Sequence, residues 1–346
     1  MMNRHRLLQS TFSPGYLSAF AVLLLLSFVT FSCSGRPEGR QRVSNTTSGN
    51  VSSACTPSFS ADSAYRYVEE QCVFGPRVPG TDAHARCADY LAAHFGRCNA
   101  DTVIIQRGTT TIYDGSEKPL ANIIASFGVD KSRRVMLCAH WDSRPFADEE
   151  AYAAHRRQPI VGANDGASGV GVIMEIARQL SLCQPAIGVD LILFDLEDWG
   201  APDWERSLLP DGGWALGSAY WSENPHVRGY SANYGILLDM VGAAGATFYR
   251  EYLSEQQAGW VNDKVWTAAA ELGLNHIFVN RPGGAVTDDH INVLRAGVPC
   301  IDIIQYAPDT ETGFFDRWHT TRDDLSVIDP YTLNAVGQVV TSLIYK

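Results

Sequence analysis

The most informative hydrophobic pattern in the chain is a run of four apolar residues, 191–194, that is followed at once by acids. A continuous apolar run of this length is typical of a strand covered on both faces. The acids that follow it are Asp195, Glu197 and Asp198. Open α/β sheets bind ligands outside the carboxyl ends of their strands. The pattern therefore predicts a functional site directly after this strand.

Strand-like and helix-like patterns alternate along the chain from residue 61 onward. Apolar residues at helical spacing predict helices, and short apolar runs bounded by turn residues predict strands. The expected helices cover residues 61–73, 81–97, 166–180, 256–272 and 331–345. The expected strands cover residues 102–106, 121–127, 134–140, 189–195, 234–241 and 299–305. This alternation predicts an α/β fold with a doubly wound, mostly parallel central sheet and helices on both faces.

Two segments, residues 199–221 and 273–289, interrupt this alternation and are expected to be irregular loops. Long irregular loops in a compact domain are usually functional or disordered. The first segment contains four tryptophans, which argues against disorder. Aromatic loops beside the acids predict a walled, partly dry pocket. The alternative is that these indoles only pack the loops onto the core.

Further acids and histidines occupy similar positions, after an apolar run or in a glycine-rich turn. They are His140, Asp142, Asp165, Asp239 and His319. A single aspartate at such a position is more often a helix cap or a turn residue. Several of them on one rim repel one another unless a cation is present. Histidine with carboxylates is a ligand set suited to zinc, so the pattern predicts a zinc site.

The ends and the middle of the chain differ in composition. With 346 residues, 45% of them hydrophobic, the chain can bury a large core, and residues 57–346 are predicted to form one catalytic domain. Residues 1–33 combine basic residues, an apolar run and Cys33, which favours a bacterial lipoprotein signal. Plain export and an uncleaved anchor are the alternatives. Residues 34–56 are predicted to form a flexible tether.

These segments predict an exported protein, periplasmic or held as a lipoprotein facing the periplasm or the exterior. Membrane contact is expected only through a lipid or signal anchor. The formal net charge is −11, and a domain this acidic should repel nucleic acid. Of the eight cysteines, Cys33 would be lipidated, which leaves an odd number and at least one free thiol. Cys138 and Cys300 lie in apolar strands and are expected to be buried thiols.

Six segments taken together resemble the zinc-aminopeptidase-like superfamily. They cover residues 138–145, 161–178, 191–200, 236–243, 288–304 and 318–320. Within that superfamily, they are most similar to the glutaminyl-peptide cyclotransferases, the zinc-type glutaminyl cyclases of animals and bacteria. The resemblance extends from about residue 78 to the C-terminus. It implies an enzyme that converts N-terminal glutamine of peptides or proteins to pyroglutamate and releases ammonia.

The resemblance also implies roles for individual residues. Asp165, Asp198 and His319 would hold one zinc ion, and Glu197 would be the general acid and base. Asp239 and Asp288 would form a hydrogen-bond network with this base. Trp204 and Trp318 would form aromatic pocket walls. At position 302, this chain carries aspartate where animal cyclases carry histidine.

The rival hypothesis is a two-zinc aminopeptidase that releases N-terminal amino acids. In such an enzyme, His140 and Asp239 would hold a second zinc, and Asp165 would bridge the two ions. Three features favour the cyclase: a second acid before His290, a tryptophan before His319, and the tryptophan-rich loops. A metal-free binding or scaffold protein is a third alternative, which would yield neither product.

Overall fold

The structure is a computed structural model that describes residues 57–346 except residues 211 and 311. The predicted signal segment, residues 1–33, and the predicted tether, residues 34–56, lie outside the described residues and stay predictions. The assignment of residues 57–346 to one catalytic domain also stays a prediction. Within the described part of the chain, no helix is both long and apolar enough to cross a membrane.

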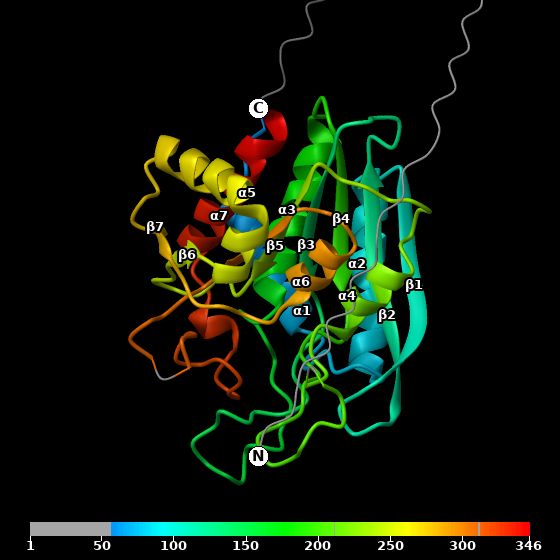
Figure 1. The fold of residues 1–346 in the computed structure, drawn as a ribbon, viewed down its shortest axis with the longest axis vertical. Coiled ribbons are helices and arrows are strands. Elements are labelled where there is room, and N and C mark those ends of the chain that lie inside the picture. The colour runs from blue at the N-terminus through cyan, green and yellow to red at the C-terminus, as the bar shows by residue number, and fades with distance from the viewer. Residues whose placement is uncertain (1–56, 211, 311) are drawn as a thin grey trace, which may run out of the picture. The chain divides into compact units, whose positions relative to one another are not determined.

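A six-stranded mixed sheet forms the centre of the described fold (Figure 1). Its strands lie in the order β1-β2-β4-β3-β5-β8. They are β1 (Thr102–Thr111), β2 (Glu117–Phe127), β3 (Arg134–His140), β4 (Gly188–Phe194), β5 (Tyr234–Asp239) and β8 (Cys300–Ile304). The last four run parallel to one another, whereas β2 is antiparallel to both β1 and β4. The predicted mostly parallel sheet is confirmed, with an antiparallel hairpin at one edge.

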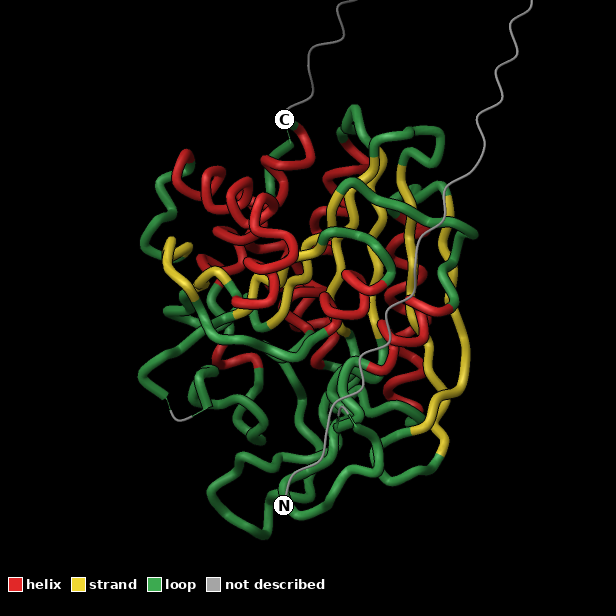
Figure 2. The backbone as a smooth tube through the Cα atoms, viewed as in Figure 1, coloured by secondary structure: helices red, strands yellow, loops and turns green. Residues whose placement is uncertain are grey.

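Helices cover both faces of this sheet (Figure 2), as the sequence predicts. One face carries α1 (Ala61–Cys72), α2 (Asp82–Arg97), α3 (Ala167–Leu182) and α7 (Pro330–Tyr345). The other face carries the shorter α4 (Leu216–Glu223) and α6 (Asp289–Arg295), which contact each other. Helix α5 (Tyr252–Glu271) packs beside β8 and α7.

Strand β4 explains why two hydrophobic cores form. All seven of its residues are buried. Leu191 and Leu193 point to the core beneath α1, α2, α3 and α7, while Ile192 and Phe194 point to the core beneath α4 and α6. Successive side chains of a strand face opposite sides of a sheet. A strand covered by helices on both faces therefore carries apolar side chains on both, as residues 191–194 do, which confirms the prediction for these residues.

Several helices begin at side chains that cap their first turn. The hydroxyl of Ser60 accepts a hydrogen bond from the Ser63 amide before α1, and that of Thr81 accepts one from the His84 amide before α2. Asp329 caps α7, whose first residue is Pro330. The capping side chains accept hydrogen bonds from amides that have no partner within the helix. The fixed φ of Pro330 suits the first position of a helix. The predicted starts of these helices lie within one residue of the observed ones.

The two segments expected to be irregular contain short regular elements. Helix α4 begins inside residues 199–221, and strand β7 (Phe278–Pro282) lies inside residues 273–289. Strand β7 pairs with β6 (Phe248–Arg250), a strand that the sequence did not predict. A 3-10 turn covers Leu325–Val327. Elements of three to eight residues are too short to produce a clear periodic pattern, which is why they were missed.

Helix α3 approaches β5 very closely. A side chain at Gly169 would place its Cβ 2.1 Å from the carbonyl oxygen of Leu238. Only glycine allows this distance, because real Cβ atoms do not come so near a backbone oxygen. The contact fixes the first turn of α3, and with it the preceding loop that carries Asp165, against the sheet.

The described cysteines include both a disulfide-bonded residue and free thiols. Cys183 is disulfide-bonded. The thiols of Cys72, Cys87, Cys98, Cys138 and Cys300 are free. Cys138 and Cys300 are completely buried, as expected from their strands. Burial raises the pKa of the Cys87 thiol to about 12, so this side chain behaves as a small apolar group.

A largely buried ion pair joins β3 to β4 at the end of the sheet where β3 begins. Arg134 Nε donates to Asp190 Oδ2 at 2.8 Å, and Arg134 Nη2 donates to Asp190 Oδ1 at 2.6 Å. Asp190 Oδ2 also accepts from the Tyr230 hydroxyl at 2.9 Å. Asp190→Asn leaves the guanidinium without its charged partner. We expect a loss of about 3 kcal/mol in the free energy of unfolding, measured by urea denaturation. A change below about 0.5 kcal/mol would contradict this role.

Candidate active site

The carboxyl ends of neighbouring parallel strands carry the predicted acids and histidines. His140 is the last residue of β3, and Asp239 is the last residue of β5. Glu197 and Asp198 follow β4, which pairs with β3. Asp165 lies in the loop before α3, and His319 in the loop between β8 and the 3-10 turn. The fold thus gathers side chains that are far apart in sequence at one edge of the sheet.

Asp165, Asp198 and His319 form a group of three potential metal ligands. Each offers one atom, and these atoms all lie within 4.8 Å of one another. His319 Nε2 is 3.0 Å from Asp198 Oδ1 and 3.6 Å from Asp165 Oδ2. All three side chains are buried, and Asp198 Oδ2 has no hydrogen-bond partner among the described residues.

A second group shares Asp165 with the first. His140, Asp165 and Asp239 also place one atom each within 4.8 Å of the others. His140 Nε2 lies 2.9 Å from Asp165 Oδ1 and 3.2 Å from Asp239 Oδ1. The side chains that could hold a second ion therefore also lie close together in the structure.

The donor sets fit zinc chemically. Zinc binds histidine nitrogen and carboxylate oxygen atoms, and catalytic zinc sites use three protein ligands and keep a fourth position open. An unpaired buried carboxylate oxygen is costly unless a cation or a proton compensates it. Asp198 Oδ2 is an unpaired buried oxygen of this kind among the described residues, and a bound cation would compensate it. The first group therefore suits a zinc ion.

Glu197 lies beside this group but is not bonded to it. Its side chain accepts no hydrogen bond from any described residue, although Glu197 is only 8% exposed. Burial and the negative charge of Asp288 raise the pKa of Glu197 well above its usual range. Burial and Asp239 likewise raise the pKa of Asp288 to about 7. A buried carboxyl group with a raised pKa is suited to exchange protons near neutral pH.

A cavity of about 400 Å³ opens onto these groups. Its polar lining consists of Asp165, Glu197, Asp198, Asp239, Thr287, Asp288 and His319. Its apolar walls include Trp214, Trp318, Phe314, Val286, Met240 and Ile304. Apolar walls with a few convergent polar groups are typical of binding sites for small ligands.

Two tryptophans stack on the His319 imidazole. The ring centroid of Trp318 lies 3.7 Å from that of His319, and the centroid of Trp214 lies 5.9 Å from it. Trp318 was predicted as a pocket wall, whereas Trp214 was not assigned this role. Trp204 does not line the cavity, because its ring packs edge-on against Phe146 and beneath Arg157. In this structure, Trp214 forms the aromatic wall expected of Trp204.

Not every acid at this edge faces the cavity. Asp195 Oδ1 contacts His84 Nε2 at 2.8 Å, and Asp195 Oδ2 accepts from the Ala121 amide at 2.7 Å. Asp142 accepts hydrogen bonds from the amides of Glu197, at 3.2 Å, and Asp198, at 3.3 Å. Asp142 and Asp195 therefore hold the turn after β4 instead of contributing to the cavity.

Residues that sequence reasoning missed hold the Asp165 loop. Asp323 accepts from the amides of Asn164, at 2.8 Å, and Asp165, at 3.1 Å. The buried Arg77 donates to the carbonyl oxygens of Val161, at 2.7 Å, and Gly162, at 2.9 Å. Asp323 follows His319 by four positions, and this proximity was the only available signal.

A third buried polar cluster lies behind the cavity. Asp288, His290 and Asp302 place ligand-type atoms within 4.8 Å of one another. His290 Nε2 also lies 3.3 Å from Glu251 Oε2. Burial and the nearby Asp288 raise the pKa of Asp302 well above its usual range.

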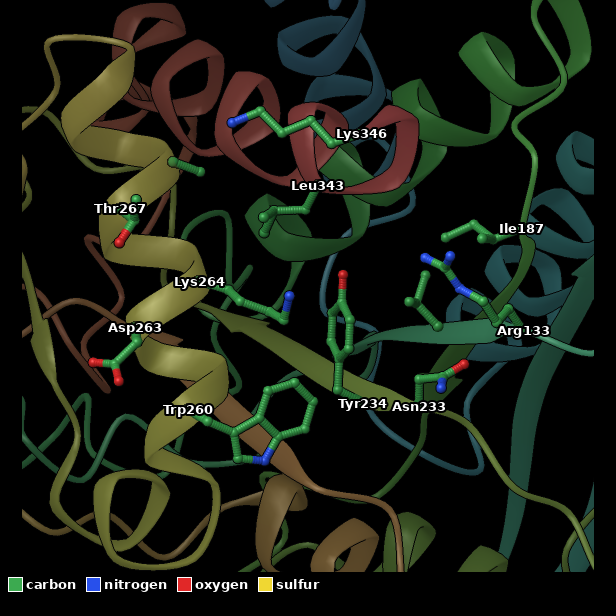
Figure 3. Close-up of a pocket in the computed structure, with 12 residues that line it drawn as sticks. Arg133, Ile187, Asn233, Tyr234, Trp260, Asp263, Lys264, Thr267, Leu343 and Lys346 are labelled. Carbon is green, nitrogen blue, oxygen red and sulfur yellow. The ribbon is translucent and has the colours of Figure 1, made fainter.

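A larger cavity of about 610 Å³ lies at the opposite edge of the sheet (Figure 3). It is lined by Arg133, which precedes β3, by Tyr234 at the start of β5, and by Trp260 and Lys264 of α5. None of the predicted site residues reaches it. The amino ends of parallel strands are also not where open α/β sheets bind their ligands. The smaller cavity is therefore the candidate active site.

The chain is similar to known proteins along most of its described length. The model of the family described as "Peptidase family M28" matches residues 122–344. A glutaminyl-peptide cyclotransferase of Bos taurus is 26% identical over 294 residues, which cover 76% of this chain and 76% of that protein.

Two solved structures match more closely. The glutaminyl cyclase of Tannerella forsythia is 52% identical with a TM-score of 0.82, over 84% of this chain and 99% of that chain. A protein described as a Zn-dependent exopeptidase of Parabacteroides distasonis is 48% identical with a TM-score of 0.83, over 84% and 100%. These similarities confirm the resemblance inferred from the six sequence segments. The zinc dependence of the second structure also agrees with the donor set.

We expect added zinc to stabilise the protein after chelator treatment, because the ion neutralises crowded buried carboxylates. At 100-fold excess over the dissociation constant, the gain in unfolding free energy is about 2.7 kcal/mol, measured by thermal denaturation. His319→Ala should abolish most of this gain. His226→Ala, which removes a histidine bonded to Trp221 outside the site, should retain it. Equal gains in both variants would contradict the ligand role of His319.

Proposed function

Because the chain belongs to peptidase family M28, we propose that it uses this cavity to cyclise N-terminal glutamine residues of peptides to pyroglutamate. The observation that carries the proposal is the position of Glu197. This free buried carboxyl group faces the cavity next to the Asp165, Asp198 and His319 group. The similarity to glutaminyl cyclases from an animal and a bacterium supports the same activity.

Asp165, Asp198 and His319 would hold one zinc ion, with a further position open to substrate. A zinc ion bound there supplies Lewis-acid polarisation of the glutamine γ-carboxamide oxygen. Asp142 accepts hydrogen bonds from the backbone amides of both Glu197 and Asp198. One side chain thus positions the proposed base, Glu197, and the proposed zinc ligand, Asp198.

The reaction is intramolecular. The α-amine nitrogen of glutamine attacks the carbon of its own γ-carboxamide, a new C–N bond forms, and the C–NH₂ bond breaks. Glu197 takes a proton from the attacking amine and returns it to the leaving nitrogen, so ammonia departs and no water is consumed. Asp239 and Asp288 line the same cavity, and burial together with the charge of Asp288 raises the pKa of Glu197.

The cavity walls favour one small side chain. Trp318, Trp214 and Phe314 enclose the space beside the acids. A site that excludes water strengthens electrostatic interactions inside it and prevents competing hydrolysis. The acidic net charge favours substrates with a free amino group.

A two-zinc aminopeptidase is the second candidate. The observation that favours it is the group of His140, Asp165 and Asp239, whose atoms also lie within 4.8 Å of one another. In such an enzyme, two ions would activate a water molecule, and the peptide bond would be hydrolysed.

The products distinguish the two candidates. We expect the purified protein to release ammonia from peptides that begin with glutamine and to leave peptides that begin with leucine intact. A coupled assay would measure the released ammonia. Mass spectrometry would show that the peptide loses about 17 Da, the mass of the ammonia that leaves in the proposed step. Release of free amino acids from either peptide would support the aminopeptidase instead. If the protein releases neither ammonia nor a free amino acid, both candidates are refuted.

Glu197→Gln should retain zinc but lose about 100-fold or more in kcat, because a positioned acid and base contributes that much. Zinc content by elemental analysis and kcat with a glutamine peptide are the two measurements. Glu117→Gln, at an exposed carboxylate of β2 that does not line the cavity, is the matched control and should keep both. Loss of zinc in Glu197→Gln would make Glu197 a ligand and not the base.

A further inference from the structure

The loop after β3 carries a buried arginine that no part of the proposed reaction uses. The side chain of Arg144 is only 1% exposed. Its Nε donates to Asp148 Oδ1 at 2.6 Å, and its Nη2 donates to Asp148 Oδ2. Its Nη1 donates to the backbone carbonyl oxygen of Asp198 at 3.0 Å. A two-pronged arginine–carboxylate pair fixes direction as well as distance, so Arg144 orients the Asp148 carboxylate.

Asp148 in turn contacts the predicted zinc ligand His319. Asp148 Oδ1 lies 3.4 Å from His319 Nδ1, while the opposite nitrogen, Nε2, faces Asp198 Oδ1 at 3.0 Å. A carboxylate beside Nδ1 favours the tautomer in which Nδ1 carries the proton. The lone pair of Nε2 then points to the group formed by Asp165 and Asp198, where a metal ligand requires it.

Arg144 also acts on the second ligand. Its Nη1 lies 3.9 Å from Asp198 Oδ1, in addition to the hydrogen bond to the Asp198 backbone. One guanidinium thus holds the backbone of one ligand directly and the imidazole of another through Asp148. Both contacts are buried, where charge interactions are screened little by solvent.

Aromatic rings prevent this arrangement from shifting. The Arg144 guanidinium lies 4.6 Å from the centroid of Trp214 and 6.0 Å from that of Phe146. The same Trp214 ring is inclined only 13° to the His319 ring. The cation, the indole and the imidazole therefore pack as one unit.

We propose that Arg144 and Asp148 are positioning residues that fix the tautomer and direction of His319 and thereby set the zinc affinity of the site. The inference rests on the proposed zinc site. It assigns to the segment from Arg144 to Asp148 a function beyond the folding of the loop. The loss of a partner that orients a metal-binding histidine typically lowers metal affinity by about 10- to 100-fold.

The test is the zinc affinity of the metal-depleted protein, measured by competition with a chromophoric chelator. Asp148→Asn keeps the shape of the side chain but removes the charge, and we expect zinc binding 10- to 100-fold weaker. Asp190→Asn is the matched control. It removes the carboxylate from the buried Arg134 pair at the other edge of the sheet, and should keep the affinity of the unaltered protein despite its lower stability.

A second measurement separates orientation from stability. Long-range ¹H–¹⁵N NMR of the zinc-free protein, in which no ion fixes the tautomer, reports which nitrogen of His319 carries a proton, with His319→Ala assigning the signal. We expect a protonated Nδ1 in the unaltered protein and a changed pattern in Asp148→Asn. If Asp148→Asn fails to fold, Arg144→Lys decides the question. Lysine keeps the positive charge but cannot donate two parallel hydrogen bonds to the Asp148 carboxylate. We expect it to weaken zinc binding at least tenfold.

Three results would overturn the inference. The first is unaltered zinc affinity in Asp148→Asn or, if that variant does not fold, in Arg144→Lys. The second is an unaltered tautomer of His319 in Asp148→Asn. The third is an equal loss of affinity in Asp190→Asn, because the effect would then follow from stability alone. An unaltered protein that binds no zinc would instead refute the proposed zinc site, so the two failures are distinguishable.

Discussion

The fold buries many carboxylates, and each of them needs a positive charge or a hydrogen-bond donor as a partner. The rest of the site depends on this constraint. Backbone amides satisfy Asp142, and a histidine with an amide satisfies Asp195. Arg144 neutralises Asp148. These solutions leave Asp165 and Asp198 close together at the cavity, where Asp198 Oδ2 has no hydrogen-bond partner among the described residues. A divalent cation is the remaining partner that can balance two buried charges there.

The sheet and its helices could be predicted because their signals are local. Buried strands such as β3 and β4 are continuous apolar runs, and α1, α2 and α7 begin at capping residues that are visible in the sequence. Helix α4 gave no comparable signal. It begins after Ala215, which has a left-handed backbone and no side-chain cap. Packing against α6 stabilises it, and a contact between distant segments leaves no periodic trace.

The candidate site was predictable in position but not in the direction of its side chains. The rule that ligands bind at the carboxyl ends of strands located the acids after β4. It could not tell that Leu196 has φ of 53°, a turn that directs Asp195 away from the cavity and Glu197 toward it. The roles of Arg144 and Asp148 were equally hidden, because their partner His319 lies more than 170 positions later in the chain. Long-range contacts of this kind become visible only in three dimensions.

The stacking of two indole rings on a single imidazole has an optical consequence. Trp214 and Trp318 are two of only eight tryptophans in the chain, and both touch the same histidine. Indole emission is sensitive to the charge and polarity of its immediate neighbours. When the imidazole coordinates an ion, the surroundings of both rings change together. The protein therefore carries a built-in fluorescent reporter of site occupancy, which needs neither a label nor a substrate.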